Sequence, residues 1–168
     1  MIQKNAFWIL TVLLIFVLQV TISDHISVGG VTPNLFLLAT IFFAVRGGPL
    51  VGEMIGFVLG LFSDVTSICL FGSQIFMMTL IGYLVGRLER KVDEEKYSAQ
   101  MVLVFLMSFL NLGGLLFLEA LFGGGTQRFR DKMAVLGPLY STMVSPILFW
   151  ALLQWATLFG RTDLKIKL

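Results

Sequence analysis

The stretch FWILTVLLIFVLQVTIS, residues 7–23, contains no ionisable side chain, and none occurs between Lys4 and Asp24. At a rise of ~1.5 Å per residue, a helix over this stretch comes close to crossing the ~30 Å hydrocarbon core of a bilayer. Further apolar blocks follow and stop at short charged segments, so little of the chain is left for anything else. The sequence therefore predicts a polytopic membrane protein.

The composition agrees with this prediction and excludes several functions. The chain has 168 residues, of which 57% are hydrophobic and 13% charged, against roughly 25% charged in ordinary soluble domains. We expect a single all-α transmembrane domain over residues 1–168. The net charge of +2 gives no reason to expect nucleic acid, and one cysteine, Cys69, excludes an internal disulfide. No catalytic, metal-binding or cofactor-binding motif occurs, so we expect neither an enzyme nor a cofactor.

The apolar blocks predict six membrane-spanning helices. We interpret the first as a retained signal anchor, because it is longer than an h-region of ~7–15 residues and no small-residue cleavage site follows it. The second and third blocks, 31–45 and 49–64, fall short of the ~20 residues that a straight span needs. A re-entrant hairpin, which protein must then bury, is the alternative for these two. The predicted spans are about 6–23, 31–45, 49–64, 71–86, 99–122 and 139–159.

The basic residues predict the orientation. With six spans and a cytoplasmic N-terminus, nine of the twelve Lys and Arg residues fall on the cytoplasmic side and three outside, which is the bias of the positive-inside rule. Both termini are then cytoplasmic. The inner set is Lys4, Arg46, Arg87, Arg90, Lys91, Lys96, Arg161, Lys165 and Lys167, and the outer set is Arg128, Arg130 and Lys132.

Small residues recur at helical spacing in the third and fourth blocks. Glycines four residues apart leave one face of a helix open to a neighbouring backbone. We favour packing between helices of the same chain over an oligomer interface as their role. The glycines are Gly52, Gly56 and Gly60 in one block and Gly82 and Gly86 in the next.

Three carboxylates, Glu53, Asp64 and Glu119, lie in or at the edge of predicted spans, where charge is costly. We expect Glu53 near the cytoplasmic surface, and Asp64 near the outer boundary, where it can cap a following turn. Ser108, Asn111 and Glu119 form a polar stripe on one helix. This stripe indicates either an internal hydrogen-bonding or partner-contacting face, which we favour, or a path for a small molecule or ion.

The segments PNLFLL, RGGPLVG, GFVLGLFSDVTS and GYLVGRL, all between residues 33 and 88, resemble the pattern of the MreD family. MreD proteins are small multispanning rod shape-determining proteins of the bacterial inner membrane. One departure is Ile68 after Ser67, where the family often has a glycine. The resemblance carries over signature residues, none of them catalytic: Pro33, Asn34, Arg46, Gly52, Gly56, Gly60, Asp64, Gly82 and Arg87.

The resemblance implies a six-helix bundle similar to the substrate-binding (S) subunits of energy-coupling-factor importers. It also implies a non-enzymatic scaffold that binds an MreC-like bitopic protein and, through it, MreB and the RodA/transpeptidase cell-wall synthase. A glycine-containing helix face is our hypothesis for the partner's docking site. The alternative function is the substrate-binding membrane subunit of a vitamin or metal importer, with a ligand pocket that opens outward. Membrane lipids are partners in either case.

Overall fold

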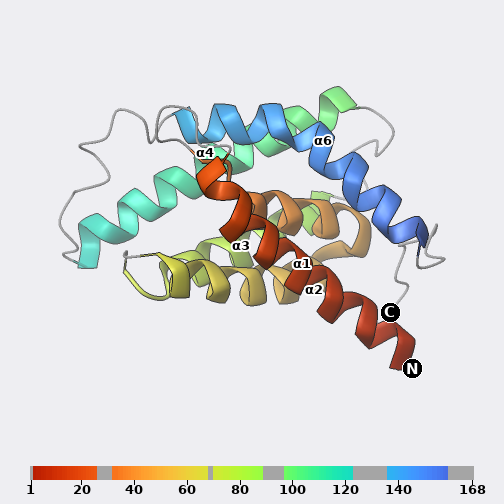
Figure 1. The fold of residues 1–168 in the computed structure, drawn as a ribbon. Coiled ribbons are helices and arrows are strands. Elements are labelled where there is room, and N and C mark those ends of the chain that lie inside the picture. Colours follow the sequence, from red (N-terminus) through yellow and green to blue (C-terminus); the bar gives the residue numbers. More distant parts are fainter. Residues whose placement is uncertain (1, 26–31, 68–69, 89–96, 123–135, 159–168) are drawn as a thin grey trace.

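The computed structural model describes residues 2–25, 32–67, 70–88, 97–122 and 136–158. These residues contain five helices, and no strand occurs among them (Figure 1). The helices are α1 (Ile2–His25), α2 (Leu35–Thr66), α3 (Ser73–Leu88), α4 (Tyr97–Phe122) and α6 (Leu136–Leu158).

The prediction of six separate helices is wrong for the described residues, because residues 35–45 and 49–64, from the second and third predicted spans, belong to one element, α2, which is interrupted at Gly48. Helices α1, α3, α4 and α6 cover the other four predicted ranges to within a few residues. These boundaries were predictable because the apolar blocks end at charged or glycine-rich segments. The middle of the chain was harder, because its two blocks are joined by only three residues, Arg46, Gly47 and Gly48.

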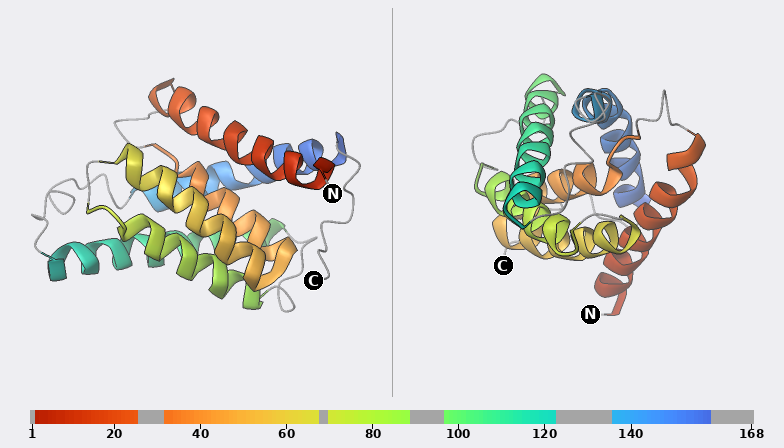
Figure 2. Two further views of the ribbon diagram at one scale, coloured as in Figure 1. Left: turned by 90° about the horizontal axis from the view of Figure 1, so that it is seen from below. Right: turned by 90° about the vertical axis from the view of Figure 1, so that its left-hand side faces the viewer.

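Helix α2 turns back on itself at Gly48. This residue has φ 78° and ψ −174°, which interrupts the helix, and Pro49 follows it. The ring of Phe16 on α1 lies 6.3 Å from that of Phe36 and 4.9 Å from that of Phe62, measured between centroids. In one straight helix the Cα atoms of Phe36 and Phe62 would be ~39 Å apart. The two halves of α2 therefore lie alongside each other as a helical hairpin (Figure 2).

The first half of this hairpin forms the centre of the molecule. Every residue from Leu35 to Val45 is buried, including Leu38, Ala39, Ile41 and Ala44, which have no exposed surface. This half is short for a membrane span, but protein surrounds it. That is the condition under which short or broken segments are tolerated at membrane depth.

The remaining helices enclose this centre. In Figures 1 and 2, α4 and α6 run side by side on one side of the bundle, and the second half of α2 packs with α3 on the other. Helix α1 packs against α2, and Trp155 Nε1 of α6 donates a hydrogen bond of 3.1 Å to Thr11 Oγ1 of α1. The five helices thus form one bundle around the first half of α2.

The outer surface of the bundle is apolar. By length and composition, three helices of the described residues are apolar enough to cross a membrane: Gln100–Phe122 of α4, Leu136–Trp155 of α6, and α2, although α2 is divided at Gly48. Large hydrophobic side chains point outward from α4 and α6; Val102, Met143, Ile147 and Trp150 are all more than half exposed. Such a surface is stable in lipid and not in water. The protein is a membrane protein.

Candidate functional site

The glycines of α2 and α3 face each other within the chain. A Cβ atom added to Gly52 would meet the backbone carbonyl of Gly82, and one added to Gly56 would meet the carbonyl of Met78. At Gly60 it would lie 2.7 Å from Ile75 Cα. The two backbones therefore touch over about two helical turns, as small residues permit in membrane helices.

This seam continues to the bend of α2. Gly86 of α3 packs against the backbone of Pro49, so the same helix faces meet as far as the turn at Gly48. The face formed by Gly52, Gly56 and Gly60 is thus covered by α3 and is closed to another protein. The hypothesis that a partner helix docks on these glycines does not fit this placement.

Asp64 holds the start of α3. Its side chain is 2% exposed, and its Oδ2 accepts backbone N–H groups of Gly72 and Ile75, each at 3.0 Å. Its Oδ1 accepts the N–H of Gln74 at 3.1 Å. The first N–H groups of a helix have no partner inside the helix, and a carboxylate is well suited to accept them. Asp64 therefore joins the end of α2 to the beginning of α3.

Pro33 and Asn34 anchor the beginning of α2. Asn34 is its N-cap; Oδ1 accepts the N–H of the residue three positions ahead at 3.0 Å, and the Asn34 N–H donates to Ser141 Oγ of α6 at 3.1 Å. Gln19 of α1 accepts the N–H of Leu35 at 2.7 Å and donates to the carbonyl of Pro33 at 3.4 Å. The buried half of α2 is thus fixed to both α1 and α6.

Arg46 and Arg87 lie at the other end of the α2–α3 pair, near the bend. The Arg46 guanidinium carbon is 5.1 Å from the centroid of the Phe42 ring, and that of Arg87 is 5.5 Å from the Tyr83 ring. Cation–π contacts of this kind hold an arginine against an aromatic face. Both signature arginines therefore mark the end of the bundle at which α2 reverses.

The polar stripe of α4 is buried in the bundle. Ser108, Asn111 and Glu119 are each 6% exposed or less. Within the described part of the chain, Ser108 Oγ and Asn111 Oδ1 have no hydrogen-bond partner, and the same holds for Ser73 Oγ and Gln74 Oε1 of α3. Arg128 and Arg130, the first basic residues after Glu119 in the sequence, lie outside the described part of the chain. No group of three potential metal ligands occurs among the described residues.

A groove on the outer surface of the α2–α3 pair was not identified from the sequence. It has a volume of about 430 Å³. The sequence predicts Glu53 as a carboxylate near the cytoplasmic surface, but its place in a groove depends on how closely α2 and α3 approach each other. The groove is lined by Glu53, Phe57, Gly72, Ile75, Phe76, Thr79, Leu80 and Tyr83.

Comparison with known proteins gives one match. The model of a family described as rod shape-determining protein MreD matches residues 1–159. No curated protein and no solved structure matches the chain. The expected likeness to importer S subunits therefore has no support.

Proposed function

We propose, because this chain belongs to the MreD family of rod shape-determining proteins, that it is a non-enzymatic membrane scaffold of the cell-wall elongation machinery. The family is a structural part of the rod-shape system, which generally involves MreC and MreB, and it is not a known enzyme family. The finer proposal is that the chain binds an MreC-like bitopic protein laterally in the bacterial inner membrane. Both of its termini lie in the cytoplasm in this proposal.

The observation that carries the proposal is how the signature residues are used. Pro33 and Asn34 anchor the start of α2, and Asp64 joins α2 to α3. The glycines bring the two backbones into contact. Each of these residues shapes or fixes the helical hairpin, and none of them forms a reactive centre. That use is what a scaffold requires, because a rigid surface binds a partner at a lower entropic cost.

The proposal is tested by purification of the tagged chain from its own host in a mild detergent, with mass spectrometry of the proteins that accompany it. The expected result is recovery of an MreC-like bitopic protein in near-stoichiometric amount. A tagged, unrelated multispanning protein of the same host, expressed to the same level, is the control. Recovery of transporter ATPase subunits with their coupling membrane protein would overturn the scaffold and establish the importer subunit.

A further inference from the structure

We propose that the groove between the second half of α2 and α3 is the docking surface for a transmembrane helix that carries a lysine or arginine at the level of Glu53. This inference rests on the proposed function, and it names the surface and the chemistry of the partner. The groove lies on the exposed side of the helix pair whose other contacts are already described. It holds one carboxylate, and its remaining side chains are uncharged.

The position of Glu53 makes its carboxylate costly without a partner. Glu53 is exposed on the outer side of α2. Because Gly52 packs against Gly82, the neighbouring Glu53 lies at the level of Gly82 along α3. Arg87 lies five residues, or ~7.5 Å, beyond Gly82 toward the end of α3. Glu53 is the fifth residue of the second half of α2, at the edge of an apolar helix pair, where an ionised carboxylate needs water or a counter-charge. A cationic side chain from a neighbouring helix removes this cost and fixes the register of docking.

The charged groups around Glu53 leave this role open. Arg87, on the same helix pair, is held over the ring of Tyr83. Arg46, on the first half of α2, lies over the ring of Phe42. Neither arginine forms an ion pair with Glu53 in the described part of the chain. A basic residue on a partner helix is therefore the complementary charge that we assign to Glu53.

The shape of the groove favours a helix as the occupant. Along α3 its lining residues run from Gly72 to Tyr83, which is ~17 Å or about three helical turns. Ile75 and Thr79 form a half-buried floor, while Phe76, Leu80 and Tyr83 stand exposed beside it. Side chains spaced three and four residues apart on a partner helix fit between such ridges. Because the glycine seam holds α2 and α3 together, the surface is preformed.

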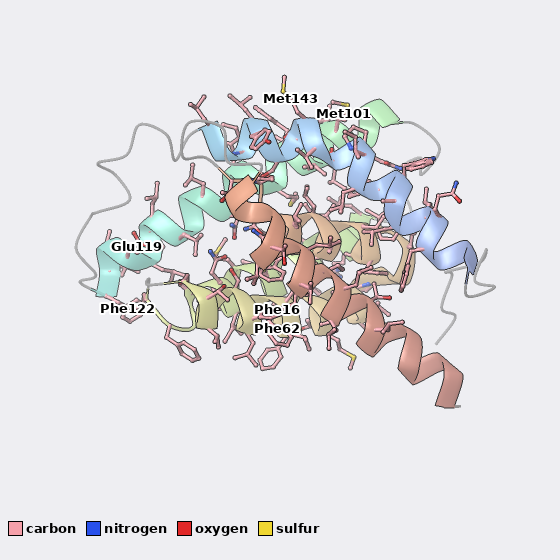
Figure 3. The ribbon with its side chains drawn as sticks, in the orientation of Figure 1. Phe16, Phe62, Met101, Glu119, Phe122 and Met143 are labelled. Atoms are coloured by element: carbon pink, nitrogen blue, oxygen red, sulfur yellow. The ribbon has the colours of Figure 1, made fainter. Side chains whose placement is uncertain are left out.

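The first test is photo-crosslinking in membranes that contain this chain and the MreC-like bitopic protein of the same host. A photoreactive phenylalanine analogue replaces Phe76, which is 57% exposed in the groove, or Met143, which is 73% exposed on α6. Figure 3 places Met143 on the far side of the bundle from Phe62 of α2. The expected result is a crosslink to the bitopic protein from position 76 and none from position 143.

The second test concerns charge. Glu53→Lys places the new lysine opposite the basic residue of the partner helix. Because the two charges repel, at least a tenfold loss of the co-purified bitopic protein is expected. A smaller loss is expected for Glu53→Gln. Met54→Lys is the matched control, because Met54 is exposed at nearly the same depth but does not line the groove. Replacement of the partner's basic residue by glutamate should restore binding to Glu53→Lys, provided that thermal unfolding shows all variants folded.

The outcomes separate the two proposals. If the wild-type chain recovers no bitopic protein, the proposed function itself fails. If it does recover the protein, but position 76 gives no crosslink to it and Glu53→Lys binds normally, only the docking surface is overturned. A crosslink from position 76 to phospholipid alone, or to a second copy of this chain, also overturns it and identifies the true occupant.

Discussion

Single polar side chains determine how the ends of the helices are held. Asp64 accepts three backbone N–H groups from the segment between Gly72 and Ile75 while almost fully buried. Asn34 does the corresponding work for α2. In both cases a side chain satisfies donors that hydrocarbon would otherwise leave unpaired. The arrangement of the helices in the bundle therefore depends on a few polar residues at helix ends as well as on apolar packing.

Replacement of Asp64 by alanine leaves three N–H groups without an acceptor. We expect Asp64→Ala to lower the free energy of unfolding by ~2 kcal/mol, and Asp64→Asn, which keeps one acceptor oxygen, to lower it by less. Thermal unfolding in mild detergent, followed by circular dichroism, measures both changes. Thr66→Ala is the control and should change stability by under ~0.5 kcal/mol, because Thr66 is exposed and bonds only to carbonyls of its own helix. An unaltered Asp64→Ala protein would contradict the capping role.

Ser108 illustrates the opposite case, because its buried hydroxyl has no hydrogen-bond partner among the residues that the structure describes. Removal of an unsatisfied polar atom relieves a cost, so we expect Ser108→Ala to keep or raise the stability of the bundle. The same unfolding measurement tests this. A marked loss of stability would mean that the hydroxyl is bound to something that the helices themselves do not supply.

Residue types predicted part of this detail. A carboxylate at the end of an apolar block indicates a cap, and this was the expectation for Asp64. The hydroxyl of Ser141 as partner of the Asn34 N–H was not predictable, since the two residues are far apart in the sequence. Such a pair exists only after α2 and α6 have packed.

At the scale of the helices, the contact between α2 and α3 is limited by backbone and not by side chains. A Cβ at Gly56 would overlap the carbonyl of Met78, whereas one at Gly113 of α4 meets nothing within 4 Å. These two glycines therefore form a matched pair for the same substitution. A substitution at Gly56 tests the packing of α2 against α3, whereas the same substitution at Gly113 tests only the intrinsic helix propensity of the new residue.

We expect Gly56→Ala to destabilise the protein by ~1–3 kcal/mol, because the two helices must separate or bend to admit the methyl group. Gly113→Ala should be neutral or stabilising by up to ~1 kcal/mol, since alanine reduces the freedom of the unfolded chain. Unfolding of both variants in the same detergent measures the difference. Equal stability of the two variants would contradict the backbone contact.

The bend of α2 is a second feature at this scale. Gly48 adopts φ 78° and ψ −174°, a region that is essentially limited to glycine. We therefore expect Gly48→Ala to cost ~1–3 kcal/mol. It should also lower the yield of folded protein, because the buried half of α2 is placed by this turn. Size-exclusion chromatography and unfolding in detergent test the two effects, and a variant with wild-type behaviour in both would contradict the observed conformation.

The sequence predicted the helices well and the hairpin only in part. Apolar blocks ended by charged residues specify α1, α3, α4 and α6, because no other feature of these segments favours a structure other than a helix in lipid. The glycine spacing indicated packing within the chain, and Gly47, Gly48 and Pro49 indicated an interruption. The groove around Glu53 was beyond prediction, because it arises from the distance and angle between two helices that the spacing alone does not determine.

At the scale of the whole molecule, the protein presents an apolar surface around the buried first half of a helical hairpin. Such a protein can act on others mainly through lateral helix faces and short connecting segments. Membership of the MreD family gives that architecture a role in rod-shape determination. The groove beside Glu53 is the surface that we assign to the lateral contact.

The most direct test of this account is cell shape in the host after depletion of the chromosomal copy, with variants supplied from a plasmid. The account predicts that depleted cells lose their rod shape and become round. The wild-type chain and Met54→Lys should restore the rods, whereas Glu53→Lys, produced in equal amount in the membrane, should not. Cells that keep their rod shape without the protein, and lose instead the uptake of a vitamin or metal, would contradict the account.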